Sequence, residues 1–137
     1  MPSPLKEKRT ILLVDHDQRT SYIISLILKL NGYNVEYYEE PKPVLSRLHS
    51  RMYDLILVSL TSIETNCIEL YNQIRNEDAQ VKICFMRDNS CHNKSYCDEE
   101  FVQLSRGNHL AYCDFVDKPV NTNEILEIVA SHLEQQH

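Results

Sequence analysis

The sequence predicts an α/β protein in which helices cover both faces of a parallel sheet. Five strand-like segments alternate with segments of helical periodicity along the 137 residues, and this alternation is typical of parallel sheets with crossover helices. Segments 10–14 and 55–58 lack polar alternation, which indicates strands buried on both faces. The length fits one domain with one core. We expect a flexible tail over residues 1–9 and a single domain over residues 10–137.

The strands are predicted from short apolar runs that end at polar or turn-forming residues. The run from Leu55 to Val58 should lie at the middle of the sheet, because it has no polar face to expose. The short run 35–38 is expected nearer an edge. In chain order, the predicted strands are Thr10–Val14, Val35–Tyr38, Tyr53–Leu60, Val81–Met86 and Ala111–Val116.

The first predicted helix spans Gln18 to Asn31 between two clear end signals. Asp17 is a suitable N-cap, and Gly32 suits the C′ position that follows a helix. Apolar residues at spacings of three and four predict an amphipathic helix. They are Tyr22, Ile23, Leu26, Ile27 and Leu30.

The remaining helices are predicted from shorter patterns. A short helical face after Pro41 and Pro43 reaches about Arg51, since proline is tolerated in a first turn. Further helices are expected over Glu64–Arg75 and Glu99–Arg106. The last helix opens with the capping pair Asn121 and Glu124, and its buried stripe is Ile125, Leu126, Val129 and Leu133.

Composition excludes several classes of protein. The net charge of −6 argues against a nucleic-acid binder that works through a general basic surface. No apolar run approaches the length of a membrane span, and the N-terminus lacks the pattern of a signal peptide, so we expect a cytoplasmic protein without membrane contact. The five cysteines form no CxxC pair, which favours reduced thiols over a disulfide framework.

Three strand ends carry a family resemblance. They are Ile11–Asp15, Tyr53–Val58 and Phe115–Pro119, each placed at the carboxyl end of a predicted strand. Together they resemble the receiver domain of response regulators, the two-component and phosphorelay signalling proteins. The resemblance implies a three-layer α/β/α, flavodoxin-like fold whose five-stranded parallel sheet has the order 2-1-3-4-5.

The residues of the family's phosphoacceptor pocket carry over only in part. Asp15 fills the first acidic place after the first strand, but His16 stands where the family has its usual direct magnesium ligand. Ser59 occupies the place of the phosphate-accepting aspartate. Arg87 stands where the family has a small hydroxyl residue, whereas Lys118 matches the family's lysine. The pocket therefore looks degenerate.

These replacements predict a permanent charge cluster in place of a switchable site. Arg87 and Lys118 would balance Asp15, and in one arrangement Asp17 as well, without any metal or other cofactor. The resemblance also identifies Phe115 as the family's switch aromatic. We expect no catalytic residue and no metal ligand in this chain.

The function that we predict is that of a pseudo-receiver, a divergent receiver-like module that is not phosphorylated on aspartate and binds other proteins. The family implies a histidine kinase or a downstream signalling protein as partner, and contacts through the fourth helix, fifth strand and fifth helix, often in homodimers. No output domain follows in this chain, so we expect any output to act through a partner.

Three alternatives stay open at this point. The first is a response regulator that is still phosphorylated, by an unorthodox route. The second is a thiol or zinc sensor through Cys91, His92 and Cys97, although their spacing is unusual and a fourth ligand is not evident. The third is an anion or small-ligand site over Arg87 and Lys118.

Overall fold

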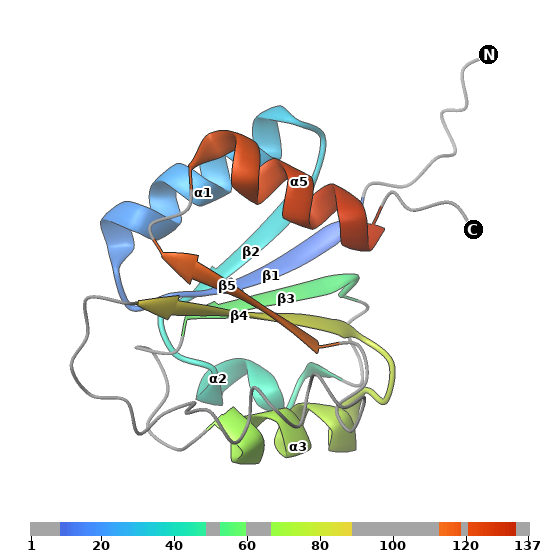
Figure 1. Cartoon of the computed structure of the whole chain (residues 1–137). Coiled ribbons are helices and arrows are strands. Elements are labelled where there is room, and N and C mark those ends of the chain that lie inside the picture. Colours follow the sequence, from blue (N-terminus) through green and yellow to red (C-terminus); the bar gives the residue numbers. More distant parts are fainter. Residues whose placement is uncertain (1–8, 49–52, 60–66, 89–112, 119–120, 134–137) are drawn as a thin grey trace.

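The fold is a five-stranded parallel sheet with helices on both faces (Figure 1). The computed structural model describes residues 9–48, 53–59, 67–88, 113–118 and 121–133. The strand order is β2-β1-β3-β4-β5, which confirms the predicted fold class and order. The strands are β1 (Thr10–Val14), β2 (Asn34–Tyr38), β3 (Leu55–Ser59), β4 (Lys82–Asp88) and β5 (Cys113–Lys118).

The helices form the two outer layers. In Figure 1, α1 and α5 lie on one face of the sheet, and α2 and α3 lie on the other. Among the described residues, no helix is long and apolar enough to cross a membrane. The described helices are α1 (Gln18–Leu30), α2 (Lys42–Leu45), α3 (Cys67–Glu77) and α5 (Thr122–Leu133).

Alternate strand residues divide into two cores, because successive side chains of a strand point to opposite faces. One core joins the sheet to α2 and α3, and the other joins it to α1 and α5. In β3, Ile56 and Val58 enter the first core, and Leu55 and Leu57 enter the second. All residues of β3 are buried, which confirms its predicted place at the middle of the sheet.

The last three predicted strands agree with the structure in position but differ in their ends. β3 begins at Leu55 and ends at Ser59. β4 runs two residues further than predicted, through Arg87 and Asp88, and β5 runs through Lys118. The reason is that the ladder between β4 and β5 continues with polar residues, which apolar periodicity does not reveal.

The ends of α1 and α5 match their predicted caps. The Asp17 side chain accepts hydrogen bonds from the backbone of the first turn of α1, and Gly32 adopts a φ of 95°, which favours glycine after the helix. The backbone N–H of Glu124 donates to Oδ1 of Asn121 at 2.7 Å. The predicted stripe of α5 is also confirmed, since Ile125, Val129 and Leu133 are buried and Leu126 packs partly buried against the same core.

The apolar residues that predicted α1 are not the ones that the helix buries. Its buried residues are Ser21, Ile24 and Leu28. Ile27 packs partly buried against the core, but the rest of the predicted stripe lies on the exposed side. The amphipathic interpretation was wrong in orientation because α1 is apolar on two opposite sides.

The remaining predictions concern α2, α3 and segments outside the described residues. α2 is a single turn that ends at Leu45, so the predicted reach to about Arg51 was wrong, although Pro43 lies in the first turn as predicted. α3 extends two residues beyond Arg75. The predicted helix Glu99–Arg106, the loop with Cys91, His92 and Cys97, and the terminal tail lie outside the described residues.

Candidate functional site

The register of the sheet brings Asp15 and Ser59 to the same edge. Val14 of β1 pairs with Val58 of β3, and Asp15 and Ser59 are the next residues along these two strands. Neighbouring strands lie about 4.8 Å apart, so the two residues are adjacent at the carboxyl ends of the strands. Both residues are fully buried, with relative exposures of 0%. This edge is where open α/β sheets place their functional groups.

Hydrogen bonds made by Asp15 fix the turn after β1. Its Oδ1 accepts from the backbone N–H of Asp17 at 2.9 Å. Its backbone N–H donates to the carbonyl of Tyr38 at 3.1 Å, and its carbonyl accepts from the Tyr37 hydroxyl at 2.9 Å. The carboxylate therefore has a structural task in the turn.

Asp17 is engaged at the start of α1. Its Oδ1 accepts from the backbone N–H groups of Arg19 at 3.1 Å and Thr20 at 3.3 Å. Its Oδ2 accepts from the Thr20 hydroxyl at 2.8 Å. These hydrogen bonds orient the Asp17 carboxylate toward the helix backbone. An N-cap of this kind stabilises a helix by about 1 kcal/mol.

His16 and Ser59 stand in contrasting surroundings. His16 is exposed between the two acids. Ser59 is the buried last residue of β3 and pairs in register with Met86 of β4. A search of the described residues finds no group of three His, Cys, Asp or Glu side chains that could hold a metal ion.

Arg87, Lys118 and Phe115 are placed by the backbone alone. Arg87 lies one residue beyond Met86, the partner of Ser59, and pairs with Asp117 of β5. Lys118 pairs with Asp88, and Phe115 pairs with Phe85. The sheet thus carries both basic residues to the edge that holds Asp15. Their predicted ion pairs depend on side chains outside the described part of the chain.

Two contacts at this edge were not foreseen from the sequence. The hydroxyl of Tyr37 on β2 donates to the carbonyl of Asp15. The Gln18 side-chain amide donates to the Glu39 carboxylate, which ties the start of α1 to the end of β2. Sequence alone gives little signal for either, because both join segments that the parallel crossover brings together.

The chain matches a known family along most of its length. The family model of the response regulator receiver domain matches residues 11–130. Response regulator ArlR of Staphylococcus saprophyticus is 28% identical over 126 residues, and the CAI-1 autoinducer sensor kinase/phosphatase CqsS of Vibrio cholerae is 28% identical over 130 residues. Each alignment covers 92% of this chain, but the chain spans 53% of the first relative and 18% of the second.

Solved structures share the fold. A CheY-like receiver domain protein from Methanospirillum hungatei superposes with a TM-score of 0.75 at 21% identity, covering 93% of this chain and 95% of that one. The receiver domain of a LuxO repressor protein from Vibrio parahaemolyticus gives a TM-score of 0.74 at 16% identity, covering 93% and 92%. At these identities the likeness shows the fold alone.

Proposed function

The chain belongs to the response regulator receiver domain family, and we propose that within this family it is a divergent member, a pseudo-receiver that is not phosphorylated on aspartate. It forms one domain over residues 10–137 and acts in the cytoplasm by binding other signalling proteins. A histidine kinase or a downstream signalling protein is the expected partner, and a homodimer is a further arrangement to test. The chain contributes no catalytic residue of its own.

The observation that carries this proposal is the buried Ser59 at the end of β3. An acyl phosphate forms on a carboxylate, and a serine hydroxyl is a weak nucleophile without an adjacent base. Asp15 lies beside Ser59, but it is buried and accepts the Asp17 N–H in a turn. Asp17 itself caps α1. Neither carboxylate occupies the acceptor position of the family.

His16, the residue after Asp15, argues against magnesium binding in this pocket. Magnesium prefers oxygen ligands in near-octahedral geometry, and the family's acceptor chemistry needs such a cation. His16 stands where the family has an acidic ligand, and it is exposed. The loss of two carboxylates, at His16 and Ser59, leaves Asp15 as the pocket's remaining matched acid, so a divalent cation has few anionic ligands.

The proposal is tested by exposing the full chain to a phosphoryl donor. Purified protein is incubated with acetyl phosphate and magnesium, and its intact mass is measured before and after hydroxylamine treatment. We expect the mass to stay unchanged. A stoichiometric, hydroxylamine-labile phosphoryl adduct would support a receiver phosphorylated by an unorthodox route, with Asp17 as the first residue to examine.

A further inference from the structure

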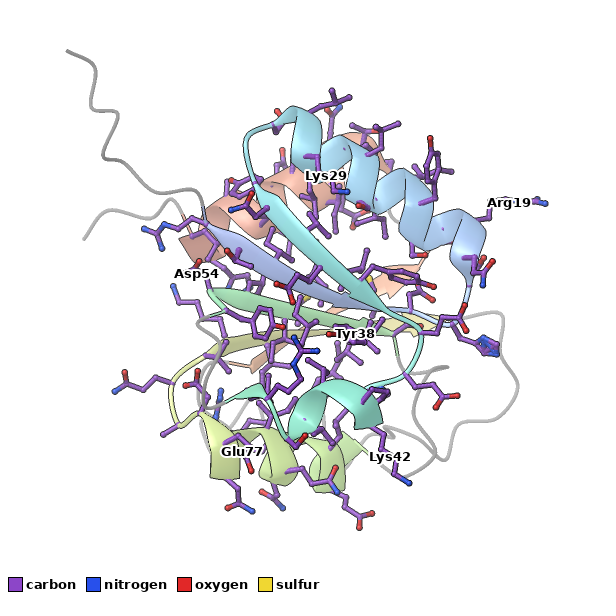
Figure 2. The ribbon with its side chains drawn as sticks, turned by 180° about the vertical axis from the view of Figure 1, so that it is seen from behind. Arg19, Lys29, Tyr38, Lys42, Asp54 and Glu77 are labelled. Atoms are coloured by element: carbon purple, nitrogen blue, oxygen red, sulfur yellow. The ribbon has the colours of Figure 1, made fainter. Side chains whose placement is uncertain are left out.

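The strand β2 forms one edge of the sheet. It is the end strand of the order β2-β1-β3-β4-β5, and among the described strands it pairs with β1 alone. Figure 2 shows this strand running between α1 and α2. An edge strand presents a row of backbone N–H and C=O groups with which another strand can pair.

The hydrogen bonds between β2 and β1 show which backbone groups of β2 point outward. The Asn34 N–H and the Tyr38 carbonyl both bond to the chain of β1 and its flanking residues, at 2.9 and 3.1 Å. The backbone groups of successive strand residues point to alternate sides. The even-numbered residues of β2 therefore face β1, and the backbone groups of Val35 and Tyr37 point away from the sheet.

The sequence of β2 lacks the features that usually protect an edge strand. Proteins protect such edges with lysine, proline or a bulge, and the segment NVEYY contains no lysine or proline and pairs with β1 residue for residue. Valine and tyrosine also favour strands. The opposite edge strand, β5, has three charged residues in the segment CDFVDK. Of the two edges, β2 is therefore the one that favours pairing with another strand.

The single charged residue of β2 lies near an arginine of the segment that includes α2. The Glu36 Oε1 accepts from the Tyr53 hydroxyl at 2.6 Å. Two residues further along β2, the Tyr38 hydroxyl accepts from Nη1 of Arg47 at 2.6 Å, and the Arg47 Cζ lies 6.0 Å from the centre of the Tyr38 ring. Tyr38 packs against the core beneath α2 and α3, and alternation places Glu36 on the same face. A carboxylate and a guanidinium thus lie on one face beside the edge.

We propose that β2 pairs antiparallel with β2 of a second copy of this chain, about a two-fold axis at Tyr37, so that two sheets join into one. In this register the outward-pointing Tyr37 faces Tyr37 of the second copy. Glu36 faces Tyr38 of the second copy, over which Arg47 of that copy is placed, and the symmetry forms this contact twice. The inference rests on the proposed function, since it names a surface for the homodimer considered there.

The charges favour this register and this occupant. Sliding one strand by two residues would place Glu36 opposite Glu36 of the second copy, and like charges directly opposite are destabilising. An extended peptide of another protein could also pair with β2, but a second copy supplies a complementary charge for both Glu36 and Arg47. Each copy carries a net charge of −6, so overall repulsion and a short pairing segment predict a weak dimer.

The test is sedimentation equilibrium of the full chain over a wide range of protein concentration. We expect a monomer–dimer equilibrium. Glu36→Lys and Arg47→Glu each place like charges together in both symmetric contacts, so each should weaken the dimer about tenfold. An equimolar mixture of the two variants should restore it, because one contact then joins the introduced lysine to the introduced glutamate and the other joins the natural Glu36 to the natural Arg47.

Matched controls separate this contact from net charge and from the bond to Tyr53. Glu69→Lys on α3 and Lys42→Glu on α2 (Figure 2) make the same changes in charge at exposed positions and should leave the dimer intact. Tyr53→Phe removes the hydroxyl that donates to Glu36 and should also leave the dimer intact. Circular dichroism confirms that each variant is folded.

Tyr37 gives a second, independent pair of variants. Tyr37→Lys places two lysines opposite each other at the two-fold axis and should weaken the dimer. Tyr37→Phe should keep the dimer, although both changes remove the hydrogen bond to the Asp15 carbonyl. The comparison therefore measures the strand contact and not the loss of that bond.

Three outcomes would overturn the inference. They are a natural chain that stays monomeric at every concentration, a dimer that Glu36→Lys and Arg47→Glu weaken no more than the control variants do, and a mixture of these two variants that forms no more dimer than either alone. None of these outcomes involves phosphoryl transfer, so this inference and the proposed loss of phosphorylation can fail separately.

Discussion

At the scale of single residues, Ser59 ends β3 and Asp15 directly follows the adjacent strand β1, and only Asp15 carries a carboxylate. Both are fully buried, and the Asp15 carboxylate already accepts a backbone hydrogen bond. A second carboxylate at position 59 would place two like charges side by side in a buried setting. A serine at this position avoids that repulsion.

Replacing Ser59 with aspartate tests this repulsion. We expect Ser59→Asp to lower the free energy of unfolding at neutral pH by about 1–3 kcal/mol, because a second buried carboxylate would lie beside that of Asp15. Ser59→Asn is the matched control of similar size without the charge, and it should cost less. Urea unfolding measures both variants, and equal stability of the two would contradict the expected repulsion.

Magnesium binding is the second residue-scale prediction. With His16 and Ser59 in place of two carboxylates, we expect no saturable binding at sub-millimolar magnesium. The measurement follows the amide resonances of Asp15 and Ser59 during a titration, with calcium as a second cation. Saturable shifts at these residues below millimolar magnesium would show that the pocket still holds the metal.

At the scale of elements, the helix that sequence periodicity identified most clearly is the one whose orientation it misjudged. Tyr22, Ile23, Leu26 and Leu30 follow helical spacing, but so do Ile24 and Leu28, which the structure buries. Periodicity finds an apolar stripe, but it does not say which of two stripes faces the sheet. Contact with β1 and β2 decides that question, and it leaves the other stripe exposed.

Two leucines of α1 test its orientation directly. Leu28→Ala removes a fully buried side chain and should cost about 2–5 kcal/mol of unfolding free energy. Leu26→Ala makes the same chemical change on the exposed side and should cost within about 0.5 kcal/mol. Thermal or urea unfolding distinguishes them. Similar losses for both variants would mean that Leu26 is part of the core.

Arg87 is the residue with which we test a link between β1 and β4. It lies one residue beyond the partner of Ser59, at the edge that holds Asp15. If Arg87 balances Asp15, then Arg87→Thr should cost about 1–3 kcal/mol, and its effect should couple with Asp15→Asn in a double-mutant cycle. Urea unfolding of the four proteins measures the coupling. Additive effects within error would rule out the charge cluster.

At the scale of the whole molecule, the parallel α/β fold could be predicted because buried strands and capped helices leave strong local signals. For that reason the structure confirms the buried strand predicted from the run Leu55–Val58. It also confirms the helix caps predicted at Asp17 and Asn121. The contacts that build the site join distant segments. The Tyr37 hydroxyl on the Asp15 carbonyl depends on the crossover between β1 and β2, which no local pattern encodes.

The sequence predicts where the residues of the candidate site lie better than it predicts how their side chains interact. The sheet register brings Asp15, Ser59 and Arg87 to one edge, where the resemblance to the receiver family implied that they would lie. The task of Asp17 as a cap followed from its place before a helix. Whether the basic residues neutralise Asp15 depends on side-chain conformations at strand ends, and these are set by charge and burial together, which no single-residue pattern encodes.

Phosphoryl transfer to a variant with the family's usual pocket residues tests most directly whether this chain is a pseudo-receiver. The full chain and a triple variant, His16→Asp, Ser59→Asp and Arg87→Thr, are treated side by side with acetyl phosphate and magnesium, and the phosphoryl groups per chain are counted from the intact mass. We expect none on the natural chain and a hydroxylamine-labile phosphoryl group on the triple variant, with none on Ser59→Asp alone. A labile phosphoryl group on the natural chain would contradict this expectation.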